Sequence, residues 1–379
     1  MPKKLLIVGG GDGGTILANR LARRVKRDDL EIEVIDKEET HFYQPGFLFV
    51  AFGEADRRSI SKQRARLYSP GVRFTRAEVR RIDLGRREVE LKDGGRKSYD
   101  YLVIATGSAL NYDDIPGFKE GANHIWTLED AERLHQALKN FKGGSVVIGV
   151  GGLTYKCPVA PLEIAFLTDE FLRSRGLREK SEIKFVSPLE RPYGPRLLNR
   201  VIVESMKERG IEPVTFFTVD SIDPQRREVH SLEGDSLKYD MLILSPPHRG
   251  AEVILNSGIG DDEGWIPVDR HYLRIRDYDD AFAIGDATNL PVPKTGVIAH
   301  FEASTVADNL YYELRGMERR SMFDGQSFCI IEMGREQASA QVSNYYYTEA
   351  PGLIPTRVLH LAKLSMNTMY WTCILGGYI

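Results

Sequence analysis

The chain has 379 residues, of which 42% are hydrophobic, and its 51 Lys and Arg nearly balance 54 Asp and Glu to give a net charge of −3. This length suggests about two or three domains with a large core, and the balanced charge without a long basic block excludes nucleic acid as an expected partner. No stretch reaches the ~18 uncharged apolar residues of a membrane span, and three cysteines are too few for a disulfide-stabilised secreted scaffold.

The N-terminal stretch predicts a dinucleotide-binding turn. Residues 4–8 form a short apolar run typical of a buried strand and too short for a signal peptide, and a helical pattern continues to about Arg24. A second apolar strand, residues 31–35, ends at Asp36 and Lys37. The turn has G-x-G-x-x-G spacing over Gly9, Gly11, Asp12, Gly13 and Gly14. Such glycines let backbone amides approach a pyrophosphate, and the acid can accept ribose hydroxyls. The alternative is a glycine turn in a sheet without a ligand.

Three further stretches decide which dinucleotide is expected. Residues 41–45 open an apolar stretch, residues 101–107 form a strand that ends in Ala-Thr-Gly, and residues 281–287 form a strand that ends in Gly-Asp. In this order they resemble the two-dinucleotide-domain flavoprotein oxidoreductases, which implies FAD as the cofactor. Besides the glycine turn, Asp36 and Lys37, the resemblance implies as FAD-binding residues Gln44, Pro45, Val79, Ala105, Thr106, Gly107, Gly285, Asp286, Lys294, Thr295 and Gly296.

The same resemblance implies an α/β fold with two Rossmann-like dinucleotide-binding domains, one of them split by the other. We expect the first part of the FAD-binding domain at residues 1–112 and its second part at residues 249–315. The inserted domain, which carries Cys157, is expected at residues 113–248, and a C-terminal region with Cys329 and an amphipathic tail at residues 316–379.

The first turn of the inserted domain departs from the dinucleotide motif. Thr154 occupies the place of the third glycine, where a Cβ atom would hinder close packing of the helix on the strand. No acid follows the next strand, which ends at residues 186–188 with Val-Ser-Pro. We therefore expect this domain to lack a nicotinamide site.

A cysteine signature stands where that site would be. Residues 156–163 read Lys-Cys-Pro-Val-Ala-Pro-Leu-Glu and match the K-C-P-x-A-P-x-E pattern of sulfide:quinone oxidoreductases and of the flavin subunit of flavocytochrome c sulfide dehydrogenases. The resemblance extends over nearly the whole chain and includes Cys329. It implies that Cys157 and Cys329 form a redox disulfide beside the flavin, whereas each thiol alone could be a small buried hydrophobe. Glu163 is a predicted proton carrier, with an exposed first-turn acid as the alternative.

Two positions qualify this resemblance. Many sulfide:quinone oxidoreductases carry a further cysteine where this chain has Trp126, so no covalent FAD link or sulfur-release role of that cysteine can be assigned here. Lys294 is expected near the flavin ring, where a cation could stabilise the reduced anionic flavin, and the alternative is a solvated lysine in a proline-rich loop. The histidines lack metal-ligand spacing, so no metal ligand is predicted.

The C-terminal tail bears on the electron acceptor. Residues 356–371 have a helical pattern with Arg357 and Lys363 as charges, and residues 365–379 carry no charge but include Tyr370 and Trp371. This is too short to span a bilayer but suits a helix lying in the membrane interface. The alternative is a helix packed on the protein's own core or in a dimer interface. We expect a peripheral protein on the cytoplasmic face of the cell membrane, and a homo-oligomer is left open.

Together these observations predict a sulfide:quinone oxidoreductase. Sulfide attacks the Cys157/Cys329 disulfide, electrons pass to FAD and then to a membrane quinone, and sulfur or polysulfide is produced. Three alternatives remain: a sulfide dehydrogenase flavoprotein subunit that donates to a haem protein, a type II NADH:quinone oxidoreductase, and a redox-sensing flavoprotein without turnover.

Overall fold

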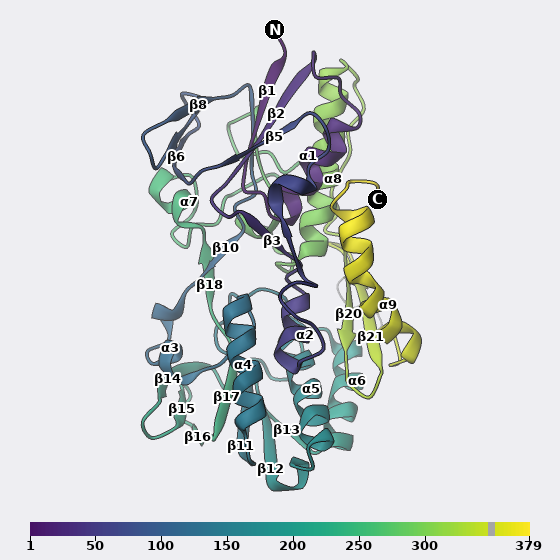
Figure 1. Ribbon diagram of the computed structural model, residues 1–379. Helices are drawn as coiled ribbons and strands as arrows, with labels where there is room; N and C mark the ends of the chain where they lie inside the picture. The colour runs from purple at the N-terminus through teal and green to yellow at the C-terminus, as the bar shows by residue number, and fades with distance from the viewer. Residues whose placement is uncertain (348–352) are drawn as a thin grey trace.

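The computed structural model describes residues 1–347 and 353–379. Two α/β units lie one above the other in Figure 1, and a C-terminal hairpin and helix run along one side of them. The expected α/β class with two parallel sheets is confirmed.

The upper unit is organised around a five-stranded sheet in which every neighbouring pair of strands is parallel. Its order is β19 (Ala281–Ala283), β9 (Tyr101–Ile104), β1 (Lys3–Val8), β2 (Leu30–Asp36) and β5 (Val72–Arg76). The sheet is buried on both faces, which explains why its strands are continuous apolar runs.

Alternate residues of β1 belong to two separate cores. Leu5 and Ile7 pack in the core that includes α1 (Asp12–Ala22) and α8 (Gly296–Leu314). Leu6 and Val8 pack in a second core. That core also receives the meander β6 (Val79–Asp83), β7 (Glu88–Leu91) and β8 (Arg96–Ser98), together with α7 (Glu252–Ser257).

The lower unit has a parallel sheet in the order β13 (Ile211–Val214), β12 (Ser181–Val186), β11 (Gly144–Val150) and β17 (Met241–Ser245). One set of its side chains packs with α4 (Leu128–Asn140), α5 (Ala160–Ser174) and α6 (Arg196–Arg209). The other set packs with α3 (Phe118–Gly121) and the meander β14 (Val219–Asp223), β15 (Glu228–Ser231) and β16 (Ser236–Lys238).

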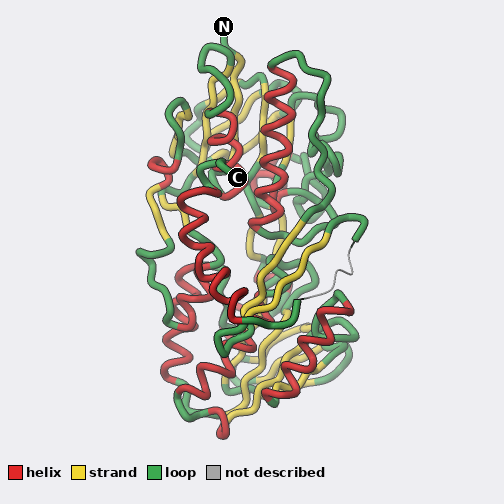
Figure 2. Tube along the Cα trace, turned by 90° about the vertical axis from the view of Figure 1, so that its right-hand side faces the viewer, coloured by secondary structure: helices red, strands yellow, loops and turns green. Residues whose placement is uncertain are grey.

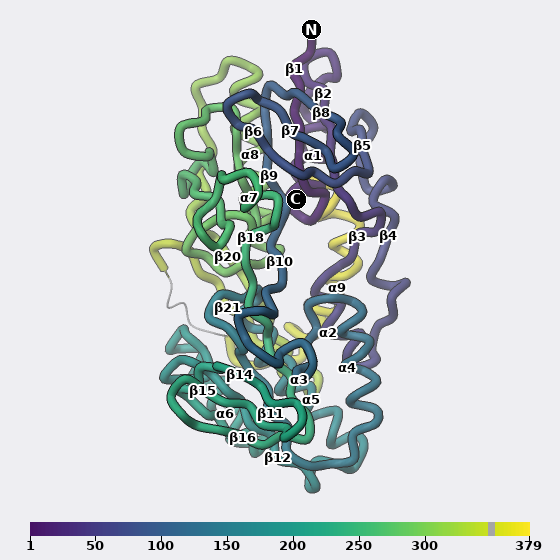
Figure 3. The backbone as a smooth tube through the Cα atoms, turned by 90° about the vertical axis from the view of Figure 1, so that its left-hand side faces the viewer, coloured from purple at the N-terminus to yellow at the C-terminus, as the bar shows by residue number. Residues whose placement is uncertain are grey.

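The chain passes between the units on two short strands that pair with each other. Strand β10 (Ser108–Leu110) runs antiparallel to β18 (His248–Gly250), and Figure 3 shows them side by side between the units. Strand β19 comes after this return and nevertheless joins the sheet of β1. On this basis we propose domain boundaries at residues 112, 248 and 315, because the chain passes from one unit to the other near the first two of these positions.

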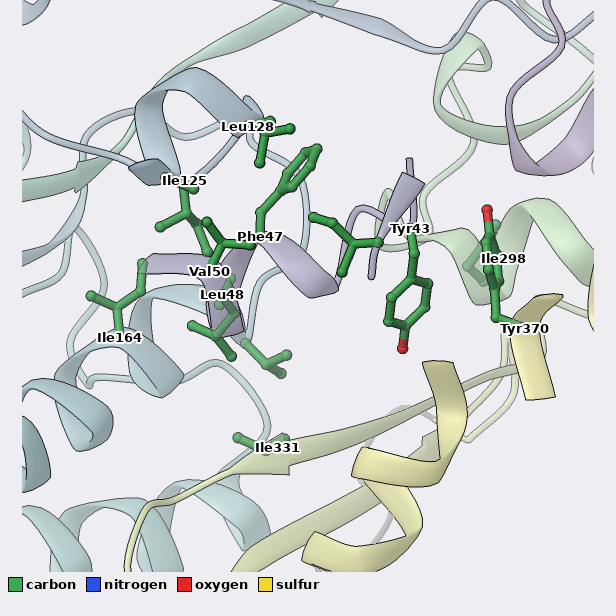
Figure 4. Packing of buried hydrophobic residues seen from close by; sticks show 14 of the residues in the cluster. Tyr43, Phe47, Leu48, Val50, Ile125, Leu128, Ile164, Ile298, Ile331 and Tyr370 are labelled. Atoms are coloured by element: carbon green, nitrogen blue, oxygen red, sulfur yellow. The ribbon is translucent and has the colours of Figure 1, made fainter. Parts of the chain in front are cut away.

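Helix α2 (Gly46–Phe52) lies between the units and has all of its residues buried. It follows β3 (Thr40–Phe42), which pairs with β4 (Ser61–Gln63). A helix that is apolar on every side is stable only inside a core. Figure 4 shows Phe47, Leu48 and Val50 of α2 beside Ile125, Leu128 and Ile164 of the lower unit, with Ile331 on the nearby hairpin.

The C-terminal region consists of the antiparallel hairpin β20 (Ser327–Glu332) and β21 (Ala338–Ser343), helix α9 (Arg357–Met369) and a π-helical turn over Tyr370–Ile374. The end of the chain then returns to the upper unit, as Figure 2 shows. Asn19 Nδ2 donates to Leu375 O at 2.7 Å and Arg23 Nε to Gly376 O at 2.7 Å. The predicted helix is therefore present, and the residues after it pack on α1.

Candidate active site

The glycine turn after β1 has the shape of a dinucleotide cradle. Helix α1 begins at Asp12, directly after Gly11, so its N-terminal amides face the turn. A Cβ atom on Gly14 would lie 2.0 Å from Gly9 O, and one on Gly9 would lie 2.3 Å from Ala105 O. A Cβ on Gly11 would meet nothing within 4 Å. Two glycines thus permit close backbone packing, while the middle one borders open space where a pyrophosphate fits.

Polar atoms around this turn also fit a cofactor. Asp36 Oδ2 accepts a hydrogen bond from Gly10 N at 2.6 Å, so this acid holds the turn itself, and Lys37 beside it is exposed. Thr106 Oγ1 and Ser108 Oγ are buried without a hydrogen-bond partner among the described residues. Because buried hydroxyls are normally paired, these atoms are suited to a polar ligand. The residues present fit FAD.

A second helix N-terminus meets the first. Helix α8 begins at Gly296, and Thr295 caps it by accepting a hydrogen bond from Ile298 N at 3.3 Å. A Cβ on Gly296 would lie 2.6 Å from Asp12 Oδ2, so the two helix starts are in contact. Their positive ends together favour an anionic ligand.

The remaining residues predicted to bind FAD lie after β9 and β19, at the start of β6 and before α2. Gly285, with φ 69°, and Asp286 follow β19, and Gly107, with φ 69°, follows β9. Val79 is half-buried at the start of β6, and Gln44 and Pro45 are exposed before α2. Their contact with FAD stays a prediction.

Lys294 is directed toward the Gly-Asp turn. Its Nζ donates to Asp286 O at 3.2 Å and to Thr288 O at 2.8 Å, and lies 3.7 Å from the ring centroid of Trp265. It is therefore not the solvated lysine of the alternative. Its predicted role at the flavin ring is untested.

Cys157 lies in the loop between β11 and α5. Unlike α1, helix α5 does not begin at the glycines but only at Ala160. Cys157 has a left-handed φ of 53°, which is uncommon for a residue with a side chain. Its N–H donates to Lys294 O at 3.0 Å, which fixes the cysteine loop against the segment before α8.

Cys329 is half-buried on β20 and lines a cavity of about 590 Å³. The cavity wall also includes Pro158 and Val159, the two residues after Cys157, and Tyr155 and Tyr193. Both cysteines are free thiols in this structure. Burial raises the pKa of Cys157 to about 12 and that of Cys329 to about 11, and the two thiols are close enough for charge on Cys329 to add to the shift at Cys157. The predicted disulfide stays a prediction.

Glu163 lies within electrostatic range of both thiols and is only 4% exposed. Its Oε1 accepts a hydrogen bond from Glu332 N at 2.8 Å and pairs with Lys363 Nζ of α9. Burial raises the pKa of this carboxyl, and Lys363 opposes the shift. The alternative of an exposed first-turn acid is therefore wrong.

Lys156 is a site residue to which the sequence assigned no role. Its Nζ lies 3.1 Å from Asp286 Oδ2 and donates to Gln44 Oε1 at 3.0 Å. The residue before Cys157 thus connects two predicted FAD-binding residues. Its position inside the cysteine signature was the available signal.

Tyr370 is a second such residue. Its hydroxyl lies 2.5 Å from Asp12 Oδ1 and 2.5 Å from His41 Nε2, and Figure 4 shows its ring near Tyr43. Burial would raise the pKa of Asp12, but hydrogen bonds from His41 and Tyr370 lower it overall. The tail therefore reaches the glycine turn, a contact that no local pattern could reveal.

Trp126 packs near the start of β18. Its ring centroid lies 6.2 Å from that of His248, with the rings nearly perpendicular. Burial lowers the pKa of His248 to about 3, so this imidazole is neutral at physiological pH. Trp126 supplies no nucleophile where relatives of the resembled family carry a cysteine.

The chain is similar to known proteins both in sequence and in fold. The family model of the pyridine nucleotide-disulphide oxidoreductases matches residues 3–304. A mitochondrial sulfide:quinone oxidoreductase of Dictyostelium discoideum is 30% identical, over 99% of this chain and 86% of that protein. The mitochondrial enzyme of Mus musculus is 26% identical, over 99% of this chain and 87% of its own length. A solved sulfide:quinone oxidoreductase from Aquifex aeolicus has the same fold, with a TM-score of 0.90 and 24% identity over 99% of this chain and 92% of that one.

Proposed function

The chain belongs to the pyridine nucleotide-disulphide oxidoreductase family, and from this premise we propose that it is an FAD-dependent sulfide:quinone oxidoreductase. The observation that carries the proposal is the juxtaposition of a cysteine pair with a dinucleotide cradle. Cys157 is hydrogen-bonded to Lys294 O, and Lys294 in turn braces the turn of Asp286.

The cradle would be formed by the glycine turn at residues 9–14, the Thr106 hydroxyl and the paired N-termini of α1 and α8. When bound there, FAD supplies a carrier that takes two electrons from the cysteine pair and passes them to a quinone.

The cavity at Cys329 suits the sulfide step. With Cys157 and Cys329 joined as a disulfide, a hydrosulfide entering the cavity attacks the Cys329 sulfur, because Cys329 lines the cavity wall. The new S–S bond makes Cys329 a persulfide, and the broken one releases Cys157 as a thiolate. When the disulfide re-forms, the outer sulfur of the persulfide leaves as zero-valent sulfur, and the cysteine pair gives up two electrons. Oxidation of one hydrosulfide thus releases two electrons and one proton, and these electrons, with that proton and one more from solvent, convert the quinone to a quinol.

Glu163 is suited to move the protons of this exchange. Burial raises the pKa of Cys157 to about 12, so its thiolate is a strong base and a poor leaving group until a proton is supplied. Burial also raises the pKa of Glu163, which brings this carboxyl closer to a proton-exchanging state near neutral pH.

The alternatives fit less well. An NADH-using enzyme would need a helix start at the glycines of the inserted unit, but α5 begins only at Ala160. There is also no carboxylate at the end of β12, where Ser187 instead donates to Arg191 O at 3.0 Å. No observation favours a haem-protein acceptor or a sensor without turnover over a quinone.

We also propose that α9 lies on a membrane surface, from which a lipid-soluble quinone is drawn. Val358 and Leu361 leave 75% and 54% of their surfaces exposed on the outer side of this helix. An apolar side facing outward, followed by Trp371 and Tyr378, favours the bilayer interface. Across residues 1–347 and 353–379, no helix combines the length and apolar character that crossing a bilayer requires. The cytoplasmic face and any oligomer stay predictions.

Steady-state assays with a soluble quinone analogue test the proposed function. Purified FAD-loaded protein is expected to reduce the quinone when sulfide is the electron donor, and not when NADH is. Quinone reduction driven by NADH alone would contradict the proposal.

A further inference from the structure

We propose that Lys363, carried by the C-terminal helix, is a positioning residue that fixes the Glu163 carboxylate for proton exchange beside the redox cysteines. The catalytic part of this inference rests on the proposed function.

Lys363 contacts the helix that follows Cys157 and the strand that carries Cys329. Its Nζ pairs with Glu163 Oε1 on α5, the helix that follows Cys157. The same Nζ donates to Ile330 O at 3.0 Å, the carbonyl of the residue directly after Cys329. One ammonium group thus ties α5, the helix after Cys157, to β20, the strand that carries Cys329.

Glu163 Oε1 accepts two hydrogen bonds. It accepts from Glu332 N at 2.8 Å as well as from Lys363, so the carboxylate plane is held by two donors on one oxygen. Charge-assisted hydrogen bonds of this kind fix geometry strongly. Proton exchange then takes place at Oε2, whose direction Lys363 and Glu332 determine.

Helix α9 is oriented so that its polar side faces the protein. His360 and Lys363, with side chains only 16% and 11% exposed, lie on the inner side, and His360 Nδ1 is 2.8 Å from Glu332 Oε2. Val358 and Leu361 lie on the outer side. This is the reverse of an ordinary surface helix, and it is explained if the inner polar side chains pair with buried carboxyl groups.

Within residues 1–347 and 353–379, Lys363 is the cation that acts on Glu163. The charged and titratable groups that face this carboxyl are Lys363 from α9, Glu332 and Cys329 from β20, Cys157 from the loop before α5, Tyr43 from the segment before α2, and Tyr193 from the segment before α6. The others are neutral or anionic, so removing Lys363 leaves Glu163 among groups that disfavour its charge. Its pKa is then expected to rise further.

The test measures the protonation of Glu163 directly. Infrared difference spectra of the FAD-loaded protein are recorded across a pH range, and Glu163→Gln identifies the carboxyl band. In Lys363→Met the midpoint of this band is expected to move up by about one to three pH units, and in Lys363→Arg to return toward the wild type. Arg357→Met is the matched control, because Arg357 is on the same helix as Lys363 but pairs at 3.0 Å with exposed Glu336, which lies between β20 and β21.

A kinetic measurement separates positioning from a merely structural ion pair. The rate of flavin reduction by sulfide is measured as a function of pH, and the limb of this profile that is lost in Glu163→Gln is assigned to Glu163. In Lys363→Met this limb is expected to shift to higher pH by the same amount as the infrared midpoint. Lys363→Gln, which keeps a hydrogen-bond donor but no charge, should give the same shift if Lys363→Met does not fold.

Two results would overturn the proposal, and a third would refute the function on which it rests. An unchanged infrared midpoint would show that Lys363 does not control Glu163. A shifted midpoint with an unchanged pH profile would show an ion pair without a role in the reaction. Failure of sulfide to reduce the flavin of the wild type would instead refute the proposed function. This outcome differs from the first two because it is seen in the wild type and does not depend on any variant.

Discussion

The ammonium group of Lys156 lies 3.1 Å from the Asp286 carboxylate, so the residue before Cys157 forms an ion pair with the acid in the turn after β19. Both side chains are mostly buried, at 19% and 11% exposed. The pair joins the inserted unit to the FAD-binding unit, because Lys156 precedes α5 and Asp286 follows the five-stranded sheet.

This pair predicts that Lys156→Met weakens FAD binding. Removing one partner leaves the Asp286 carboxylate unpaired, at a cost of about 1–3 kcal/mol, or roughly tenfold to hundredfold in the dissociation constant. Titration of the apoprotein with FAD, followed by flavin fluorescence, measures the change. Lys142→Met, at an exposed lysine, is the control and should bind FAD as the wild type does. Equal affinities of both variants would contradict the prediction.

The buried thiols predict a steep pH dependence of alkylation. With pKa values raised by burial to about 12 and about 11, the reduced Cys157 and Cys329 are almost entirely protonated at pH 8, whereas a free thiol with a pKa of ~8.5 is partly ionised. Iodoacetamide labelling, measured by mass spectrometry, should be far slower than in the unfolded chain. It should then rise about tenfold per pH unit up to about pH 10. A rate that rises only about threefold between pH 8 and 9 and levels off near pH ~9.5 would show that the pKa values of the thiols are not raised.

The same shifts predict how the stability of the reduced protein depends on pH. The folded thiols hold their protons more tightly than unfolded thiols do, so their contribution to stability is fully present below pH ~8.5 and is lost as pH rises toward 11 and 12. Urea midpoints of the reduced protein should therefore fall between pH 8.5 and 10. The double variant Cys157→Ser and Cys329→Ser should lose this part of the pH dependence.

The presence of Trp126 predicts that FAD is not attached covalently to the protein at this position. An indole ring offers no nucleophile, so acid precipitation should leave the flavin in the supernatant. Flavin fluorescence that stays with the protein band in a denaturing gel would contradict this expectation.

The outward apolar side of α9 predicts binding to lipid vesicles. Leu361→Asp should weaken co-sedimentation with vesicles of phosphatidylcholine and phosphatidylglycerol about tenfold or more, since burial of a leucine side chain contributes about 1.5–3 kcal/mol. Leu232→Asp is the matched control, because Leu232 is 68% exposed but lies between β15 and β16, in the inserted unit. Equal losses in both variants would argue against a membrane role for α9.

The features that the sequence predicted correctly depend on local patterns. The glycine turn, the strand ending in Gly-Asp and the helix at residues 356–371 are each encoded within a few neighbouring residues, and the structure has all three elements.

The missed contacts join residues far apart in the sequence. The tail pattern gave Lys363 as a cation on an apolar stretch, but not which side of the helix would face inward. That side is set by the buried carboxylates of Glu163 and Glu332, which belong to two other elements. Tyr370 was likewise visible only as a tail aromatic, and its bond to Asp12 depends on the π-helical turn at the end of α9.

The central claim is that electrons from sulfide reach the flavin through Cys157. Anaerobic stopped-flow measurement of flavin absorbance tests it most directly, with sulfide and NADH added separately to the wild type, Cys157→Ser and Cys373→Ser. The account predicts rapid bleaching by sulfide in the wild type and in Cys373→Ser, its loss in Cys157→Ser, and little bleaching by NADH. Rapid bleaching by NADH that survives in Cys157→Ser, without bleaching by sulfide, would contradict the account and favour an NADH dehydrogenase.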